Sequence, residues 1–271
     1  MIVAPSYDEI TQRNIGVVTE DEQAKIRALR VAVAGCGALG APTAHFLARL
    51  GVGELRLADP EEFEPSNINR QFGAYVDTVG LNKAEAIARE LVRINPEVEV
   101  RTFSDGVTEE CLDAFLDGAD VVVDGLDFFS LGIELRLHEE ACRRGQWVYA
   151  GQGVVEISTT TCFDPTQPAL ADMVCEQGSP SVAKAVTSFF PVLPRTATPE
   201  LLERAISGEL PSVPSDVSGA AFGGAFLVED ILRTAIRHWP PHAVAPDVYV
   251  FNQEELWVRR WDAGRRAWTA L

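Results

Sequence analysis

The chain has 271 residues, 46% of them hydrophobic and 23% charged, and its formal net charge is -17. A sizeable apolar core is therefore possible, disorder of the whole chain is excluded, and the acidic charge disfavours a nucleic-acid partner. The apolar runs fall short of the roughly 18 residues that cross a membrane, and residues 1–13 lack the basic flank of a signal peptide. We therefore expect a cytoplasmic protein without a membrane segment.

Strand and helix patterns alternate through the first part of the chain. Short apolar runs predict strands at 30–34, 54–58, 98–103, 120–124 and 147–150, and amphipathic spacing predicts helices at 41–50, 82–94, 108–116 and 133–144. Such alternation is typical of a parallel sheet with right-handed crossovers. The predicted fold class is α/β, with a Rossmann-like, mostly parallel sheet and helices on both faces.

The alternation of strand and helix patterns ends after residues 158–163. This run is rich in Ser and Thr and predicts a further strand. Residues 164–218 are rich in Pro, Ser and Thr and contain one predicted helix, at 199–206, so we expect a long crossover loop. An apolar, glycine-rich helix at 219–238 and antiparallel strands at 247–252, 255–261 and 267–271 complete the chain. We expect one domain over 1–271: a nucleotide-binding core (1–163), the crossover loop (164–218) and a C-terminal helix with closing strands (219–271).

The five cysteines are scattered along the chain and form no C-x-x-C pair. This spacing predicts neither a zinc site built from four cysteines nor a disulfide framework, so we expect no zinc and mostly buried thiols. The cysteines are Cys36, Cys111, Cys142, Cys162 and Cys175.

A glycine-rich turn joins the first predicted strand to the first predicted helix. It reads G-x-G-x-x-G, and such glycines let a backbone approach phosphate at a helix N-terminus. Asp59 ends the second predicted strand, where a carboxylate can accept hydrogen bonds from ribose hydroxyls. These two features predict a nucleotide site, and by themselves they fit NAD, FAD and ATP equally well. The candidate residues of the turn are Gly35, Gly37, Ala38, Leu39 and Gly40.

The segment after Asp59 separates these possibilities. Residues 66–72 read Ser-Asn-Ile-Asn-Arg-Gln-Phe, which places polar and cationic groups where a dinucleotide enzyme would continue into a helix. Here the chain resembles the ThiF/MoeB type of the ubiquitin-activating-enzyme superfamily, whose hallmark is Asp-x-Asp/Glu followed by Ser-Asn-x-x-Arg-Gln. The matching residues are Asp59, Glu61, Asn67, Arg70 and Gln71.

Three further residues continue the resemblance. Lys83 follows Val-Gly-Leu-Asn at 79–82, Asp127 ends Asp-Gly-Leu-Asp at 124–127, and Arg13 lies in an N-terminal Gln-Arg-Asn-Ile-Gly element. The resemblance implies that Lys83 contacts the β- or γ-phosphate of ATP and that Asp127 holds Mg²⁺. It also implies a homodimer in which Arg13 reaches the site of the partner subunit.

The resemblance implies an ATP-dependent adenylyltransferase. Its substrate would be the C-terminal carboxylate of a ubiquitin-like or sulfur-carrier protein, or of a peptide. The carboxylate would attack the α-phosphate, so catalysis would depend on positioning and on the positive charge of Arg70, Lys83, Arg13 and Mg²⁺. Two alternatives stay open. One is activation of a small or tRNA-linked carboxylate, as in the threonylcarbamoyladenosine dehydratases. The other is an NAD(P)-binding oxidoreductase or a catalytically silent nucleotide sensor.

The sequence also departs from the family pattern. Phe128 and Phe129 replace the usual Asn after the magnesium aspartate, and Arg136 is the nearest counterpart of a later arginine. The paired zinc ligands of the sulfur-carrier activators are absent from the sequence. The family's catalytic cysteine lies on the crossover loop, where Cys175 is the candidate. A thiol there reacts only as an exposed, activated thiolate, and Lys184 is the basic residue nearby, so a catalytic and an inert Cys175 both stay open.

Overall fold

A nine-stranded sheet forms the centre of the computed structural model, which describes residues 4–167, 170–192, 194–195, 197–207, 209 and 214–269. The strand order is β11-β10-β9-β6-β5-β4-β1-β2-β3. Five strands run parallel: β1 (Arg30–Ala34), β2 (Glu54–Ala58), β3 (Glu99–Phe103), β4 (Val121–Asp124) and β5 (Trp147–Val154). Antiparallel pairing then adds β6 (Ile157–Phe163), β9 (Val248–Asn252), β10 (Trp257–Asp262) and β11 (Ala267–Thr269).

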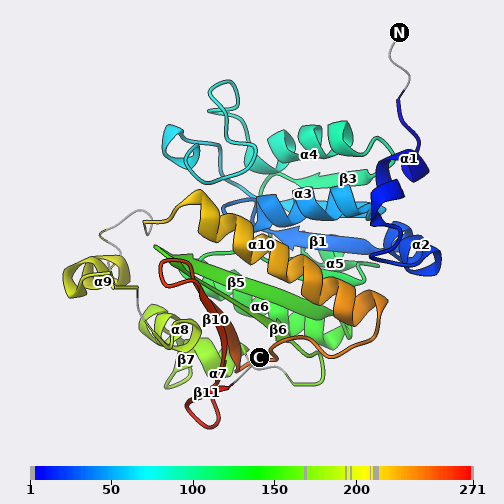
Figure 1. Ribbon diagram of the computed structural model, residues 1–271. Coiled ribbons are helices and arrows are strands. Elements are labelled where there is room, and N and C mark those ends of the chain that lie inside the picture. The colour runs from blue at the N-terminus through cyan, green and yellow to red at the C-terminus, as the bar shows by residue number, and fades with distance from the viewer. Residues whose placement is uncertain are drawn as a thin grey trace.

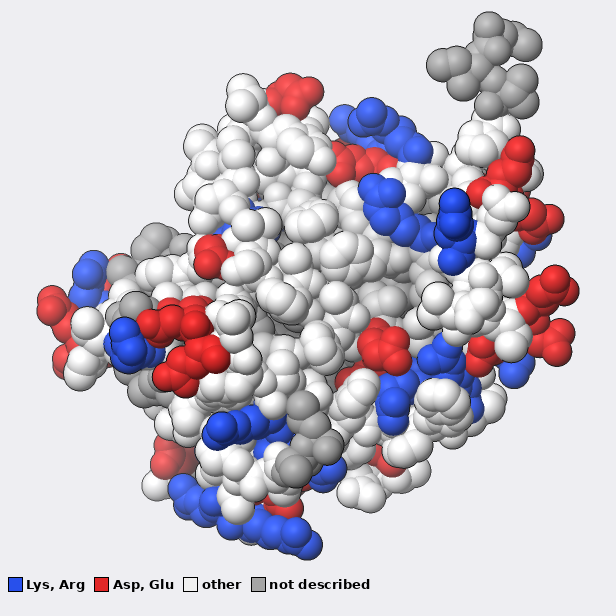
Figure 2. Space-filling view, in the orientation of Figure 1, with Lys and Arg blue, Asp and Glu red and all other residues white. Residues whose placement is uncertain are grey.

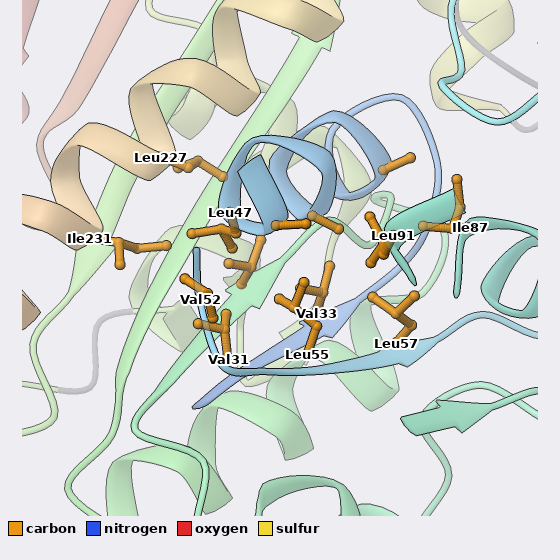
Figure 3. Packing of buried hydrophobic residues seen from close by; sticks show 14 of the residues in the cluster. Val31, Val33, Leu47, Val52, Leu55, Leu57, Ile87, Leu91, Leu227 and Ile231 are labelled. Atoms are coloured by element: carbon orange, nitrogen blue, oxygen red, sulfur yellow. The ribbon is translucent and has the colours of Figure 1, made fainter. Parts of the chain in front are cut away.

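Helices cover both faces of this sheet (Figure 1). One face carries α3 (Gly40–Leu50), α4 (Lys83–Ile94) and α10 (Val217–Ile231), and the other carries α5 (Leu112–Leu116) and α6 (Leu131–Arg143). Figure 3 shows the core on the first face, where α3 lies between α10 and α4 and all three helices pack on the strands. The labelled core side chains are Val31, Val33, Leu47, Val52, Leu55, Leu57, Ile87, Leu91, Leu227 and Ile231.

The register of the parallel strands brings three loops to one edge of the sheet. Ala34, the last residue of β1, pairs with Ala58 of β2 on one side and with Asp124 of β4 on the other. The loops that follow are tied together by backbone hydrogen bonds, since Gly35 N–H donates to Ala58 C=O and Gly125 N–H donates to Ala34 C=O, both at 2.8 Å. Residues that follow β1, β2 and β4 therefore meet at the carboxyl edge, where open α/β sheets bind ligands.

Two helices precede the first strand, α1 (Tyr7–Thr11) and α2 (Glu20–Ala28), with a 3₁₀ turn (Gln12–Asn14) between them. The hydroxyl of Tyr7 donates to the carbonyl of Gly51 at 2.9 Å, and Gly51, at φ 99°, ends α3. The N-terminal segment is therefore fixed at the C-terminal end of α3. The glycine-rich turn lies at the opposite end of this helix, about 16 Å away at 1.5 Å per residue.

The predicted α/β fold class is confirmed, and the predicted helices at 41–50 and 82–94 match α3 and α4 within one residue. The prediction of a single helix in 164–218 is wrong. Besides α9 (Pro199–Ile206), this segment contains α7 (Leu170–Val174), α8 (Val182–Phe189) and the short hairpin of β7 (Cys175–Glu176) and β8 (Ser179–Pro180). These elements are too short for a periodic pattern to emerge from the sequence.

Smaller differences concern the ends of elements. The helix predicted at 108–116 is shorter, because Thr108 forms a turn that leads into α5. The helix predicted at 219–238 ends at Ile231 and continues as a π-helix (Leu232–Ile236). The last predicted strand, 267–271, matches β11, but residues 270 and 271 lie outside the described residues. Among the described helices, none combines the length and apolar character that crossing a membrane requires.

Candidate active site

A cavity of about 280 Å³ lies at the carboxyl edge of the parallel strands. Ten of the twelve residues that the sequence analysis assigns to nucleotide or metal binding line this cavity, because they lie on the loops after β1, β2 and β4 and at the start of α4. These lining residues are Gly35, Gly37, Ala38, Leu39, Asp59, Glu61, Arg70, Gln71, Lys83 and Asp127. The other two, Gly40 and Asn67, are buried and do not line the cavity.

The glycine-rich turn packs against the turn after β4. Gly35 has φ +84°, and a Cβ on it would lie 2.5 Å from the carbonyl oxygen of Gly125. A Cβ on Gly40 would lie 1.8 Å from the carbonyl oxygen of Gly35. Both positions therefore require glycine, and the turn leaves the N-terminus of α3 facing the cavity. Backbone N–H groups at a helix N-terminus can bind an anion.

Gly40→Ala is expected to lower the free energy of unfolding by about 2 kcal/mol, because the added methyl group must displace backbone. Thermal and urea unfolding measure this change. Gly132→Ala on α6 is the matched control, since nothing lies within 4 Å of its Cβ position. Alanine in place of a helical glycine should leave stability unchanged or raise it slightly. Equal stability of the Gly40→Ala variant and wild type would contradict the packing of this turn.

Asp59 is held by the backbone of both neighbouring loops. Its Oδ2 accepts the N–H of Cys36 at 2.7 Å and its Oδ1 accepts the N–H of Glu61 at 2.9 Å. Burial raises the pKa of this carboxyl, and the positive charge of Lys83 opposes the rise. Each carboxylate oxygen has a second lone pair, so Asp59 can still accept hydrogen bonds from hydroxyl groups of a ligand.

Lys83 is a buried cation with an exposed partner. The side chain begins α4, is 4% exposed, and forms an ion pair with Glu61, whose side chain is 67% exposed. A buried charge is costly without a counter-charge. Because Glu61 can turn into solvent, a phosphate group can replace its carboxylate and keep the ammonium paired.

Asn67 positions the second cation of the cavity. It is buried, and its side chain accepts the N–H of Glu64 at 3.0 Å, which closes the 3₁₀ turn Pro65–Asn67. The carbonyl of Asn67 then accepts the N–H of Arg70 at 3.1 Å. The guanidinium of Arg70 donates to the carbonyl of Ser66 and to the side chain of Asn69, and no carboxylate pairs with it among the described residues. Burial lowers its pKa, but arginine stays charged, so Arg70 can bind an anionic ligand.

Asp127 is an exposed carboxylate on the loop after β4, and it also lines the cavity. Its Oδ1 accepts the N–H of Phe129 at 2.9 Å and the hydroxyl of Ser130 at 3.4 Å. In the described part of the chain, Oδ2 forms no hydrogen bond. Protein Mg²⁺ sites beside phosphates often use one or two carboxylates and leave the other positions to phosphate and water. Asp127 therefore fits a magnesium ion shared with a nucleotide.

The remaining wall comes from residues that the sequence analysis did not assign to the site. The amide of Gln152 donates to the carbonyl of Leu126 at 2.9 Å, and a Cβ on Gly151 would lie 2.9 Å from Thr159 O and 3.2 Å from Leu39 Cδ2. Glycine inside a strand often marks such a close approach, so the Gly-Gln-Gly run at 151–153 was the available signal. The other unassigned lining residues include Phe128, Phe129, Val182, Val186, Ser215, Gly219 and Gly223.

Arg13 and Cys175 lie outside the cavity lining. Arg13 is exposed on the 3₁₀ turn at the far end of α3 and forms no ion pair within the described residues. Cys175 is partly buried in β7, where it packs against the core on the α6 side of the sheet. Arg136 is also elsewhere, paired with Glu109 and Glu139. Within one chain, the structure therefore brings Arg70, Lys83 and Asp127 together without these three residues.

The sequence model of the ThiF family matches residues 11–261, which is most of the chain. The chain belongs to the ThiF family. The match covers every residue that lines the cavity and also includes Arg13 and Cys175.

Three relatives show the range of proteins to which this ThiF-family protein is similar in sequence. It is 42% identical over 134 residues to an uncharacterized protein of Mycobacterium tuberculosis, covering 49% of this chain and 18% of that protein. It is 34% identical over 157 residues to a Bacillus subtilis tRNA threonylcarbamoyladenosine dehydratase (58% and 59% covered) and 39% identical over 112 residues to a Haloferax volcanii SAMP-activating enzyme E1 (41% and 42%). The matches thus span less than two thirds of each relative.

Solved structures share the fold of this ThiF-family protein. A crystal structure of PaaA superposes with a TM-score of 0.66 at 18% identity, covering 97% of this chain and 71% of PaaA. The structure of Escherichia coli MccB with AMPCPP and MccA gives a TM-score of 0.68 at 18% identity, covering 95% and 73%. At these identities the likeness concerns the fold.

Proposed function

We propose that this protein is an ATP-dependent adenylyltransferase that activates a carboxylate as its acyl-adenylate. The observation that carries the proposal is the convergence of two cations, Arg70 and Lys83, and one carboxylate, Asp127, on a cavity whose other wall is a glycine-rich helix N-terminus. A hydride-transfer enzyme needs no such pair of cations beside a metal-binding carboxylate. Binding of a magnesium triphosphate needs both the cations and the carboxylate.

In the proposed reaction, a carboxylate oxygen attacks the α-phosphorus of ATP. The new bond joins this oxygen to phosphorus, and the bond from the α-phosphorus to the bridging oxygen breaks, so that pyrophosphate leaves with the electron pair. Asp59 would hold the ribose, and Arg70 and Lys83 would neutralise the charge that develops on the phosphates. Mg²⁺ held by Asp127 would supply further positive charge to the leaving group.

The substrate we propose is the C-terminal carboxylate of a ubiquitin-like or sulfur-carrier protein, or of a peptide. The relatives named as a SAMP-activating enzyme E1 and as an adenylyltransferase and sulfurtransferase MOCS3 support a protein substrate. MccB, which shares the fold, was solved together with MccA. The apolar wall formed by Phe129, Val182 and Val186 can hold the side chains that precede such a carboxylate.

A homodimer belongs to the same proposal, with Arg13 entering the cavity of the partner subunit. Figure 2 shows a face whose centre is uncharged, with acidic and basic side chains around it. Helix α10 crosses this face in Figure 1 and exposes Val217 (51%) and Phe222 (49%). Val76 in the loop before α4 is 87% exposed. Exposed apolar surface of this kind favours self-association around a two-fold axis.

A second candidate substrate is a tRNA-linked carboxylate. Dehydratases of tRNA threonylcarbamoyladenosine from B. subtilis, Haemophilus influenzae and E. coli are among the relatives, at 34%, 32% and 32% identity. The net charge of -17 opposes binding of a tRNA backbone. ATP–pyrophosphate exchange, measured with carrier-protein tails and with modified tRNA in parallel, separates the two substrates. Exchange that requires the tRNA would overturn the protein or peptide substrate.

ATP with Mg²⁺ is expected to raise the melting temperature, whereas NAD should leave it unchanged. A ligand that binds only the folded state stabilises it by mass action, by about 2.7 kcal/mol at a hundredfold excess over its dissociation constant. Differential scanning fluorimetry with each nucleotide, with and without EDTA, measures the shift. Stabilisation by NAD together with indifference to ATP would reject the adenylyltransferase in favour of an oxidoreductase.

A further inference from the structure

Three ionisable side chains are buried together beneath the turn between β4 and α6, outside the lining of the candidate active site. Asp124 is the last residue of β4, and Glu134 and His138 lie one helical turn apart on α6. Their exposed fractions are 1%, 1% and 7%. The Nε2 atom of His138 lies 2.8 Å from Oδ2 of Asp124, and one ligand atom from each of the three side chains lies within 4.8 Å of the others.

One buried carboxyl oxygen of the cluster, Oε2 of Glu134, has no hydrogen-bond partner among the described residues. Oδ1 of Asp124 accepts the N–H of Leu126 at 3.0 Å. Within the described part of the chain, no Lys or Arg forms an ion pair with either carboxyl group. Burial, followed by the charge of Asp124, holds the pKa of Glu134 well above its usual range. A buried pair of carboxyl groups is costly unless a proton or a cation neutralises it.

A second cavity gives this cluster a route to solvent. It has a volume of about 280 Å³ and is lined by His138 together with Cys142, Gln146, Phe163 and Pro165. Because His138 lines this cavity and also contacts Asp124, its ring spans the distance between the cavity and the buried carboxylates. A small ion can therefore approach His138 through this second cavity.

We propose that Asp124, Glu134 and His138 bind one divalent transition-metal ion of the zinc class. Two carboxylate oxygens and one imidazole nitrogen form a donor set that such ions accept, and their two negative charges match the charge of the ion. The unpartnered Oε2 of Glu134 gains a ligand, and water from the second cavity can complete the coordination. The cysteine spacing that predicts no zinc concerns thiolate sites and does not extend to this set of ligands.

Such an ion would fix the turn that presents Asp127 to the active site. Asp124 holds the turn through the N–H of Leu126, and Asp127 follows one residue later. The three ligands are therefore positioning residues for the proposed adenylation reaction. The metal site itself does not depend on that reaction, because metal binding can be measured without nucleotide.

The test is stoichiometric binding of Zn²⁺ to the full chain after treatment with EDTA, measured by equilibrium dialysis and calorimetry. We expect one high-affinity Zn²⁺ per chain, with affinity reduced more than tenfold in Glu134→Gln and in His138→Gln. Metal binding to a protonated carboxyl group releases its proton. Calorimetry in two buffers with different ionisation enthalpies should therefore detect release of about one proton from wild type and fewer from Glu134→Gln.

Two controls separate this site from other ligands in the chain. His242→Gln removes a histidine that also contacts a buried aspartate, Asp230, at 2.7 Å, and it should leave Zn²⁺ binding unchanged. Asp127→Asn removes the exposed carboxylate of the active site and should also leave it unchanged. Co²⁺ provides an independent readout, since its visible absorption should change in His138→Gln and persist in His242→Gln.

Two outcomes would overturn the proposal. One is binding of less than one Zn²⁺ per wild-type chain at micromolar metal. The cluster would then be a protonated carboxyl pair and not a metal site. The other is equal binding by wild type and Glu134→Gln, which would place the metal elsewhere in the chain. Glu134→Gln keeps the shape of the side chain, and circular dichroism checks its fold. If that variant does not fold, His138→Gln and the proton count still decide the question.

Discussion

Lys83→Ala is expected to lower ATP–pyrophosphate exchange by about 100-fold or more, and Asp127→Ala by a similar factor. Removing one group that stabilises charge in the transition state typically has this effect. The fold should survive both changes. The partner of Lys83 is the exposed carboxylate of Glu61, which water can solvate, and Asp127 is itself exposed. Initial rates of exchange, measured with saturating substrate, test the prediction.

The matched control for the lysine is Lys25→Ala, because Lys25 is exposed on α2 and lies outside the cavity lining. Its exchange rate should equal that of wild type. Arg70→Ala extends the series and should behave like Lys83→Ala, since Arg70 lines the same cavity. Near-normal exchange in any two of the Lys83, Asp127 and Arg70 variants, with melting temperatures unchanged, would contradict the site.

An equal mixture of Arg13→Ala and Lys83→Ala chains is expected to regain activity that neither variant has alone. Arg13 lies at the far end of α3 from the glycine-rich turn, so it cannot serve the cavity of its own chain in this conformation. In a heterodimer, the Arg13→Ala chain keeps Lys83 and receives Arg13 from its partner. One of the two sites is then complete, and the activity of each heterodimer should rise toward half that of wild type.

Native mass spectrometry must show that heterodimers form in the mixture, and a mixture of Lys25→Ala with Lys83→Ala chains serves as the reference. That reference should show the activity expected from intact Lys25→Ala sites, with no gain on mixing. Full activity of Arg13→Ala alone would remove any role for Arg13. Heterodimers that stay inactive would contradict supply of Arg13 by the partner subunit.

The sequence predicted the loops of the candidate site well because their signals are local. The glycines at 35–40 require a tight turn, Asp59 follows a short apolar run, and Asn82 begins an amphipathic helix whose first residue is Lys83. Each signal lies within a few residues of the group that it places. The parallel register then brings these loops together without further information from the sequence.

The rest of the cavity depends on contacts between distant segments, and sequence patterns could not predict it. Val182 and Val186 reach the cavity because α8, a helix of eight residues, packs beside the turn after β4. Ser215 lines it because the backbone before α10 meets the end of β5. The same limit applies to Glu134: an acidic residue in an amphipathic helix predicts a solvated side chain, whereas the tertiary structure buries it beside Asp124.

The carboxylate of Glu61 competes with anionic ligands for the ammonium group of Lys83, because the two side chains form an ion pair. A phosphate that binds Lys83 must displace a carboxylate that the chain keeps nearby, so the observed dissociation constant equals the intrinsic one divided by the fraction of time that the pair is open. In the proposed reaction, the same carboxylate would favour release of pyrophosphate, because Glu61 stays close enough to pair with the ammonium again. Binding of ATP and release of pyrophosphate would thus both depend on one exposed side chain, Glu61.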